Sequence, residues 1–118
     1  MIQVRTCALF NKTSKGYAQN KKVKEKIVDF IRTKAADPLV LYGSKDRAFT
    51  RDGNFSGFIH AGLTFDVSII YKIGTVNGQK TLDLYGVFSH DELGTGQPIN
   101  PNRQKSNSAR LNNQEIMA

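Results

Sequence analysis

The sequence predicts one α+β domain, in which an N-terminal strand and a helix pack on an antiparallel β-meander. At 118 residues the chain has room for one domain with one hydrophobic core. A helical spacing of apolar residues in the first third gives way to alternating, strand-like segments in the second half. The composition then changes after Gly94, which divides the chain into a domain of residues 1–94 and a C-terminal tail of residues 95–118.

The first ten residues predict a strand, because Ile2, Val4 and Leu9 give them a β-branched and apolar character. Residues 11–16 are polar and predict a turn, in which Thr13 or Ser14 caps the element that follows.

Residues 17–36 predict the helix. Val23, Ile27, Phe30 and Ile31 fall at positions i, i+4, i+7 and i+8, which places them on one apolar stripe. Lysines and arginines occupy much of the remaining surface, and we interpret most of them as a solvated face. Asp37-Pro38 ends the helix, because a residue before proline is disfavoured in the α conformation.

Three strands are expected in the second half of the chain. Residues 55–64 and 66–73 predict the first two, and residues 81–89 predict the last. Asn77-Gly78 lies between the second and third strands, and this dipeptide is the strongest short signal for a tight hairpin turn. Residues 39–42 predict a short strand or a buried turn, and residues 43–54 a charged loop.

The C-terminal segment is rich in Thr, Gln, Asn, Ser, Pro and Gly, with Arg103, Lys105 and Arg110 interspersed. This composition predicts a flexible, basic tail with a short helical turn near residues 109–117. The tail either adds RNA or ribosome contacts or is a disordered extension.

The charge balance limits the classes of partner. Seventeen Lys and Arg stand against ten Asp and Glu, for a formal charge of +7. Such a surface attracts polyanions, so nucleic acid, the ribosome, an acidic protein or an anionic membrane would fit, although small basic proteins without a polyanion partner are common. A single cysteine excludes an intramolecular disulfide. The sequence indicates no signal peptide and no spanning helix, so we expect a cytoplasmic protein with no membrane partner.

Three motifs point to a known family. The run from Gly57 to Ile73, GFIHAGLTFDVSIIYKI, is followed by LDLYGVFSH from Leu82 to His90 and preceded by Lys45-Asp46-Arg47. In this order they resemble the YafQ-type members of the RelE superfamily, over roughly residues 40–94. The resemblance implies a RelE-like fold and a type II toxin, an mRNA interferase that acts on the ribosome and is silenced by a small acidic antitoxin. In that family the ribose 2′-hydroxyl attacks the adjacent phosphate, without a metal or cofactor.

Such a reaction requires a base, an acid and cations that stabilise the charge on phosphorus. His90 is the first candidate for the acid or base, since it matches the family's C-terminal histidine and imidazole titrates near neutral pH. Asp66 matches the family's hairpin aspartate and is expected to orient or activate a histidine. His60 lies two residues before Gly62, where an ungapped match places the family's hairpin histidine, and it shares that strand face.

The expected phosphate and RNA contacts are cationic and aromatic. Arg47 replaces the family's upstream histidine and is suited to bidentate phosphate binding. The remaining candidates are Lys45, Arg51, Lys72 and Tyr85. The chain departs from the family at Tyr85-Gly86-Val87, where a last-strand arginine is often found.

A non-catalytic function remains open as the alternative. Each of the three acid–base candidates has a plain alternative, as a solvated histidine or a turn aspartate. The missing arginine and the displaced position of His60 favour a non-catalytic RNA- or protein-binding module, for example a phage- or plasmid-borne one. A small-molecule enzyme has no support, because the sequence has no phosphate-cradling glycine loop, nucleophile motif or metal-ligand spacing. Codon preference and oligomeric state are not indicated by the sequence.

Overall fold

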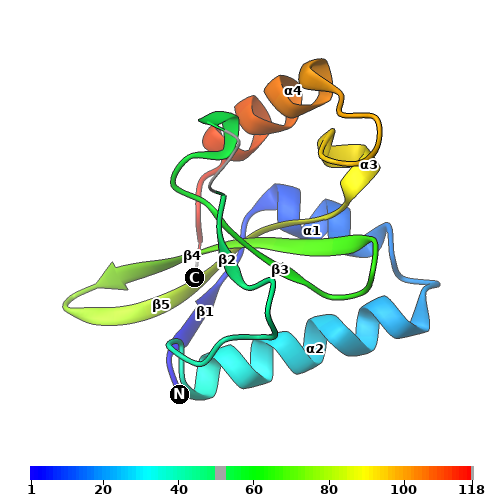
Figure 1. Ribbon diagram of the computed structural model, residues 1–118. Coiled ribbons are helices and arrows are strands. Elements are labelled where there is room, and N and C mark those ends of the chain that lie inside the picture. Colours follow the sequence, from blue (N-terminus) through cyan, green and yellow to red (C-terminus); the bar gives the residue numbers. More distant parts are fainter. Residues whose placement is uncertain (50–52, 118) are drawn as a thin grey trace.

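A computed structural model describes residues 1–49 and 53–117 of the chain (Figure 1). The described residues form the following strands and helices, given in chain order. They are β1 (Gln3–Arg5), α1 (Ala8–Lys15), α2 (Lys21–Ala36), β2 (Arg47–Ala48), the 3-10 turn η1 (Gly53–Phe55), β3 (Ile59–Gly62), β4 (Val67–Val76), β5 (Gln79–Ser89), α3 (His90–Leu93) and α4 (Pro101–Asn112). Every helix in the described residues is too short or too polar to span a bilayer.

The five strands form one sheet in the order β1-β5-β4-β3-β2. β1 runs parallel to β5, and the remaining neighbours are antiparallel. In Figure 1, α2 lies below the sheet, while α3 and α4 lie above it. The α+β class predicted from the sequence is confirmed, with a mixed sheet in place of a purely antiparallel meander.

The hairpin between β4 and β5 turns at Asn77-Gly78, as predicted. Both residues have positive φ, 51° for Asn77 and 78° for Gly78. A two-residue turn with this backbone matches the right-handed twist of the strands that it joins. The turn therefore sets the register of the longest strand pair, which runs from Val76–Gln79 to Val67–Ser89.

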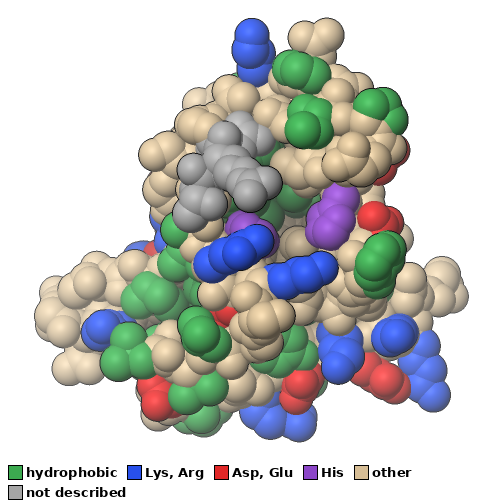
Figure 2. All heavy atoms as spheres, in the orientation of Figure 1, with side chains coloured by type: hydrophobic (Ala, Val, Ile, Leu, Met, Phe, Trp, Pro, Cys, Tyr) green, Lys and Arg blue, Asp and Glu red, His purple; other side chains and the backbone are tan. Residues whose placement is uncertain are grey.

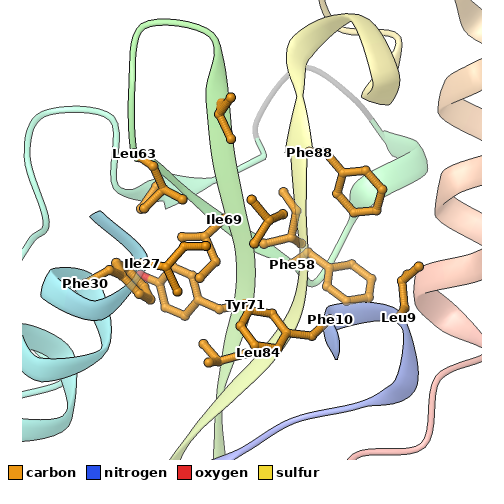
Figure 3. Packing of buried hydrophobic residues seen from close by; sticks show 14 of the residues in the cluster. Leu9, Phe10, Ile27, Phe30, Phe58, Leu63, Ile69, Tyr71, Leu84 and Phe88 are labelled. Atoms are coloured by element: carbon orange, nitrogen blue, oxygen red, sulfur yellow. The ribbon is translucent and has the colours of Figure 1, made fainter. Parts of the chain in front are cut away.

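The core is one cluster of buried hydrophobic residues, part of which is drawn in Figure 3. It includes Ile27 and Phe30 of α2 below the sheet, and Leu93 and Leu111 of α3 and α4 above it. Val23, Ile27 and Phe30 of α2 are buried, so the predicted apolar stripe is confirmed. The ring of Phe30 contacts Tyr71 of β4 edge-to-face, with ring centroids 5.1 Å apart. The helix begins at Lys21, because the side chain of Asn20 accepts the backbone N–H of Val23 and caps it.

The N-terminal segment differs from the prediction. The strand ends at Arg5, and helix α1 occupies residues that were expected to form the end of the strand and a turn. Cys7 caps this helix through its sulfur, which accepts from the N–H of Phe10. Leu9 and Phe10 are consecutive and both buried, so the local pattern resembled a strand although tertiary packing selects a helix.

The C-terminal segment also differs from the flexible tail that its composition predicted. Asn100 caps α4 by accepting the N–H of Arg103, and Pro101 occupies the first turn. Leu111 is fully buried, and the last described residue, Met117, exchanges two backbone hydrogen bonds with Thr6. The segment therefore packs on the domain and returns to the end of β1.

Polar side chains take part in this packing. Gln104 is 8% exposed and donates to the carbonyl of Gly94 at 2.9 Å, and Asn107 is 6% exposed and donates to the carbonyl of Glu92 at 2.6 Å. Buried amides that are hydrogen-bonded are stable in a protein interior. They leave no apolar periodicity in the sequence, which is why the composition alone suggested a tail.

Candidate active site

A groove with a volume of about 680 Å³ lies on the upper face of the sheet. In the space-filling view both histidine side chains reach the surface of this face, with Lys and Arg side chains next to them (Figure 2). The described residues that line the groove are Arg47, Phe49, His60, Ser68, His90, Leu93, Thr95, Gln97, Ile99 and Gln104. The groove thus brings together three residues that the sequence analysis selected, Arg47, His60 and His90.

The pairing of the strands places Arg47 beside His60. The two residues are direct partners between β2 and β3, and His60 is in turn the partner of Ile70 on β4. Paired residues on neighbouring strands point to the same face of a sheet. Ser68 lies two residues before Ile70, so its side chain joins the same face.

The environment of His60 favours the neutral imidazole. The side chain is half-buried, and the ring of Phe49 packs against it with centroids 4.4 Å apart. Burial lowers the pKa of His60 below its usual value, and the positive charge of Arg47 lowers it further, with contributions from His90 and Lys45. A neutral ring nitrogen at pH 7 is able to accept a proton.

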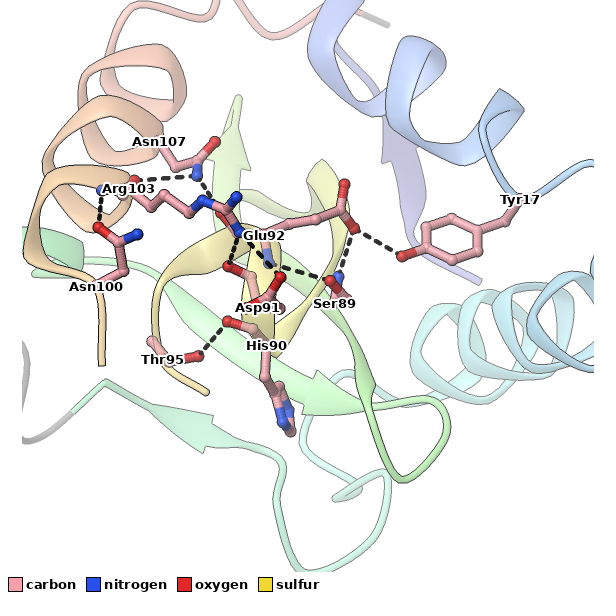
Figure 4. A network of polar contacts seen from close by, with 9 residues as sticks. All are labelled: Tyr17, Ser89, His90, Asp91, Glu92, Thr95, Asn100, Arg103 and Asn107. Atoms are coloured by element: carbon pink, nitrogen blue, oxygen red, sulfur yellow. Dashed lines mark hydrogen bonds and ion pairs between the residues drawn. The ribbon is translucent and has the colours of Figure 1, made fainter. Parts of the chain in front are cut away.

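His90 is held by its backbone at the start of α3. Its N–H donates to the carbonyl of Asp66 at 2.9 Å, and its own carbonyl accepts the N–H groups of Thr95 and Gly96. The Nε2 atom of the ring lies 3.3 Å from the Oγ of Ser68. In Figure 4 the ring points away from α4 and toward the sheet.

The short helix α3 is braced on two sides (Figure 4). Ser89 and Glu92 form a capping box, and the hydroxyl of Tyr17 donates to the same Glu92 carboxylate at 2.9 Å. On the other side Arg103 donates to the carbonyl and the carboxylate of Asp91, both at 3.0 Å, and Asn107 donates to Glu92. A four-residue helix has little stability of its own, so these contacts fix the place of His90.

The loop before β2 is anchored by a buried ion pair. Lys34 and Asp46 lie 2.9 Å apart, and both side chains are almost completely buried. Asp46 also accepts from the N–H of Tyr42 and from the hydroxyl of Tyr71. The middle residue of the Lys45-Asp46-Arg47 motif is thus structural, and it positions the arginine that follows it.

Two other predicted residues lie near the groove without lining it. The side chain of Asp66 is exposed in the turn before β4, and its contact with His90 is made by its backbone carbonyl. Lys45 is exposed, and its stem lies next to Gly62, since a Cβ added there would be 3.7 Å from its Cδ atom. Lys45 contributes to the lowered pKa of His60, so its charge acts on the groove.

Lys72 and Tyr85 form a separate cluster with Phe58. The Nζ of Lys72 lies 4.2 Å from the ring centroid of Phe58 and 5.4 Å from that of Tyr85. Neither Lys72 nor Tyr85 is among the described residues that line the groove. The remaining candidate, Arg51, lies outside the described residues.

In this row the last strand has no room for a larger side chain. Gly86 is the partner of Ile70, which places it in line with Arg47 and His60 across the sheet. A Cβ at Gly86 would lie only 2.4 Å from the ring of Phe88, which is buried. The Phe88 ring thus occupies the space of a side chain at this position.

None of the other described lining residues was predicted from the sequence as part of the site. Ser68 was open to prediction, since it occupies the same face as His60 by strand alternation. Phe49, Leu93 and the lining residues between 95 and 104 carried no signal, because their place depends on how the C-terminal segment folds back. In the described residues, no three His, Cys, Asp or Glu side chains are grouped closely enough to hold a metal ion.

The chain matches no family model and no curated protein in sequence. Its structure is similar to a YoeB/ParE toxin from Agrobacterium tumefaciens, with a TM-score of 0.61 and 16% identity over 75% of this chain and 99% of that one. It is also similar to a chain of the Escherichia coli DinJ–YafQ complex, with a TM-score of 0.62 and 19% identity over 79% of this chain and 98% of that one.

A third similar structure is a copper-bound mutant toxin from Helicobacter pylori, with a TM-score of 0.55 and 20% identity over 79% of this chain and 99% of that one. All three are matched over nearly their whole length, while at least a fifth of this chain has no counterpart in them. The chain therefore has the α+β fold of the RelE/YafQ-like toxins.

Proposed function

We propose that the chain is the toxin of a toxin–antitoxin pair and cleaves mRNA, on the ribosome, by attack of a ribose 2′-hydroxyl on the adjacent phosphate. The observation that carries the proposal is the meeting of two histidines and an arginine in one open groove. The likeness to solved YoeB/ParE and YafQ structures and the charge of +7 support it.

His60 acts as the base in this proposal. Its lowered pKa leaves the ring neutral at pH 7, so a ring nitrogen accepts the proton of the 2′-hydroxyl. The 2′-oxygen then forms a bond to phosphorus, and the bond from phosphorus to the 5′-oxygen of the next nucleotide breaks. The products are a 2′,3′-cyclic phosphate and a free 5′-hydroxyl, and no metal or cofactor takes part.

His90 acts as the acid. In its protonated form the imidazole donates to the departing 5′-oxygen, and Ser68 holds the Nε2 atom within the groove. Arg47 binds the phosphate and stabilises the charge that builds on its oxygens. Asp66 assists through its backbone carbonyl, which holds His90, and the charge of Lys45 acts on the groove. Arg51, which lies outside the described residues, remains an expected phosphate-binding residue.

In this proposal Lys72 and Tyr85 bind RNA outside the groove, further along the same sheet. Lys72 is held over two aromatic rings, so its ammonium group is fixed in place without an acidic partner in the described residues. A fixed cation of this kind is suited to a backbone phosphate outside the groove.

The proposed protein partner is a small acidic antitoxin. The excess of seven positive charges favours an acidic protein, and the YafQ neighbour was solved in a complex with DinJ. A protein that covers the groove would block access of RNA to His60 and His90 at the same time.

The test is induced expression in bacteria, with growth followed and the 5′ ends of mRNA mapped. The wild-type chain and a Lys80→Ala control, which alters an exposed lysine outside the groove, are expected to stop growth and create new mRNA ends. His60→Ala and His90→Ala are expected to lose both effects. Normal growth and unchanged mRNA in cells that contain folded wild-type protein would contradict the proposed cleavage of mRNA.

A second candidate is a non-catalytic RNA-binding module on the same fold. The observation that favours it is the row across the sheet that ends in Gly86 under the Phe88 ring, where a side chain to stabilise the transition state has no room. This candidate predicts that the purified chain binds RNA and leaves it intact, with or without ribosomes.

A further inference from the structure

The groove has two chemically different parts, and the proposed reaction uses only one of them. Arg47, His60, Ser68 and His90 supply charge and hydrogen bonds from the sheet and the start of α3. The other lining residues are apolar or uncharged: Phe49, Leu93, Thr95, Gln97, Ile99 and Gln104. This uncharged part has no role in binding a phosphate or in moving a proton.

Most of the uncharged part comes from residues 95–104, the segment that joins α3 to α4 and includes the start of α4. Backbone hydrogen bonds fix the segment at both ends. Thr95 and Gly96 donate to the carbonyl of His90, and Asn100 donates to the carbonyl of Gly94 at 2.9 Å. The side chain of Gln104 also donates to Gly94. Residues 95–104 thus form a wall of the groove that is held in place without a ligand. A preformed wall lowers the entropic cost of binding.

The wall presents apolar surface to solvent. Ile99 is 59% exposed and lines the groove, so its apolar side chain is accessible to a ligand there. Phe49 is half-buried, and its ring packs against that of His60, the proposed general base. Gln97 is exposed on the same groove, and its amide is able both to donate and to accept a hydrogen bond.

We propose that Phe49 and residues 95–104 form a subsite for one unpaired nucleobase, next to the phosphate bound at Arg47. A base has two apolar faces and a polar edge, which match Phe49 and Ile99 on one hand and Gln97 on the other. The base must be unpaired, because in a duplex both faces are stacked. The inference rests on the proposed function and adds that the groove takes a nucleotide of single-stranded RNA, in a volume of about 680 Å³ that is sufficient for one nucleotide.

The test compares ligands with and without a base, using the full chain. Uridine and adenosine 3′-monophosphates and ribose 3-phosphate are titrated separately into isotope-labelled protein, and dissociation constants are obtained from amide shifts. The nucleotides are expected to bind at least about fivefold more tightly than ribose phosphate, since stacking of one base is worth at least that factor. Amides of Phe49 and of the non-proline residues in 95–104 are expected to shift with the nucleotides only.

Two variants show whether the gain comes from the wall. Ile99→Ser is expected to reduce the nucleotide advantage by about threefold or more and to leave ribose phosphate binding unchanged. Leu39→Ser is the matched control, because Leu39 is 76% exposed and lies outside the groove. Equal affinities for nucleotides and ribose phosphate, or an Ile99→Ser protein with the wild-type ratio, would overturn the subsite.

These results are separable from the test of cleavage. If the chain binds nucleotides through the nucleobase but does not cleave RNA, the subsite is supported and the proposed ribonuclease activity is contradicted. If the chain cleaves RNA but binds ribose phosphate and nucleotides equally, the ribonuclease activity is supported and the subsite is overturned.

Discussion

The backbone N–H of His90 donates to the carbonyl oxygen of Asp66 at 2.9 Å, so the two residues are joined through the main chain. The contact links the turn before β4 to the first residue of α3. From the sequence, Asp66 was expected to orient or activate a histidine, and the structure leaves its carboxylate exposed. The two roles make different predictions for a substitution.

If Asp66 acts only through its carbonyl, Asp66→Asn should cleave RNA at a rate within about twofold of the wild type, because the backbone is unchanged. His90→Ala should lose a factor of about 10² to 10⁴, as is usual for a general acid. Single-turnover cleavage of a short RNA measures both rates. A loss at Asp66→Asn as large as that at His90→Ala would show that the carboxylate itself takes part.

The pKa of His60 predicts the acid side of the pH profile. A base must be unprotonated, so activity is expected to fall as the pH drops through the lowered pKa of His60. Arg47→Gln removes one of the positive charges that lower this pKa and should move the titration of His60 to higher pH. NMR titration of the His60 ring measures the shift without relying on activity, and a titration that stays in place would contradict the electrostatic coupling.

The Lys34–Asp46 pair is expected to be critical for stability. Asp46→Ala leaves the buried ammonium of Lys34 without its carboxylate and should lower the free energy of unfolding by about 3–5 kcal/mol. Lys34→Met with Asp46→Leu removes both charges and should be less destabilised than Asp46→Ala alone. Urea unfolding followed by circular dichroism measures each value, and a double variant no more stable than Asp46→Ala would contradict this reasoning.

The packing of α4 gives a prediction that separates it from a flexible tail. Leu111→Ala should cost about 2–5 kcal/mol, because the side chain is fully buried against the domain. Arg103→Ala breaks a largely exposed ion pair with Asp91 and should cost less than about 1 kcal/mol. Both values come from the same urea unfolding experiment. A Leu111→Ala protein as stable as the wild type would indicate that residues 101–112 do not pack.

Local signals in the sequence were sufficient for several elements. The spacing of Val23, Ile27 and Phe30 predicted α2, and Asn77-Gly78 predicted the β4–β5 turn, because both patterns report geometry within a few residues. Helix α1 was missed because its cap is a cysteine sulfur and its buried residues are adjacent. Asn100-Pro101 is a signal for a helix start that the polar composition of the segment obscured.

The site was predictable only in part for a similar reason. His60 and His90 were chosen individually from residue type and family resemblance, and the structure brings them into one groove with Arg47. The position of Phe49, Ile99 and Gln104 depends on contacts between segments that are far apart in the sequence, such as the bond from Gln104 to Gly94. Lys72 and Tyr85 were expected at the site, and the sheet carries them to a different cluster.

The central claim is that the groove of His60, His90 and Arg47 cleaves RNA through the 2′-hydroxyl. Its most direct test is incubation of the purified chain with a defined mRNA, on ribosomes and free in solution, followed by mass spectrometry of the product ends. The expected products are a 2′,3′-cyclic phosphate and a 5′-hydroxyl, with no cut where the nucleotide before the scissile phosphate carries 2′-deoxyribose. Products with a 5′-phosphate, or cleavage of the deoxy-substituted site, would contradict it.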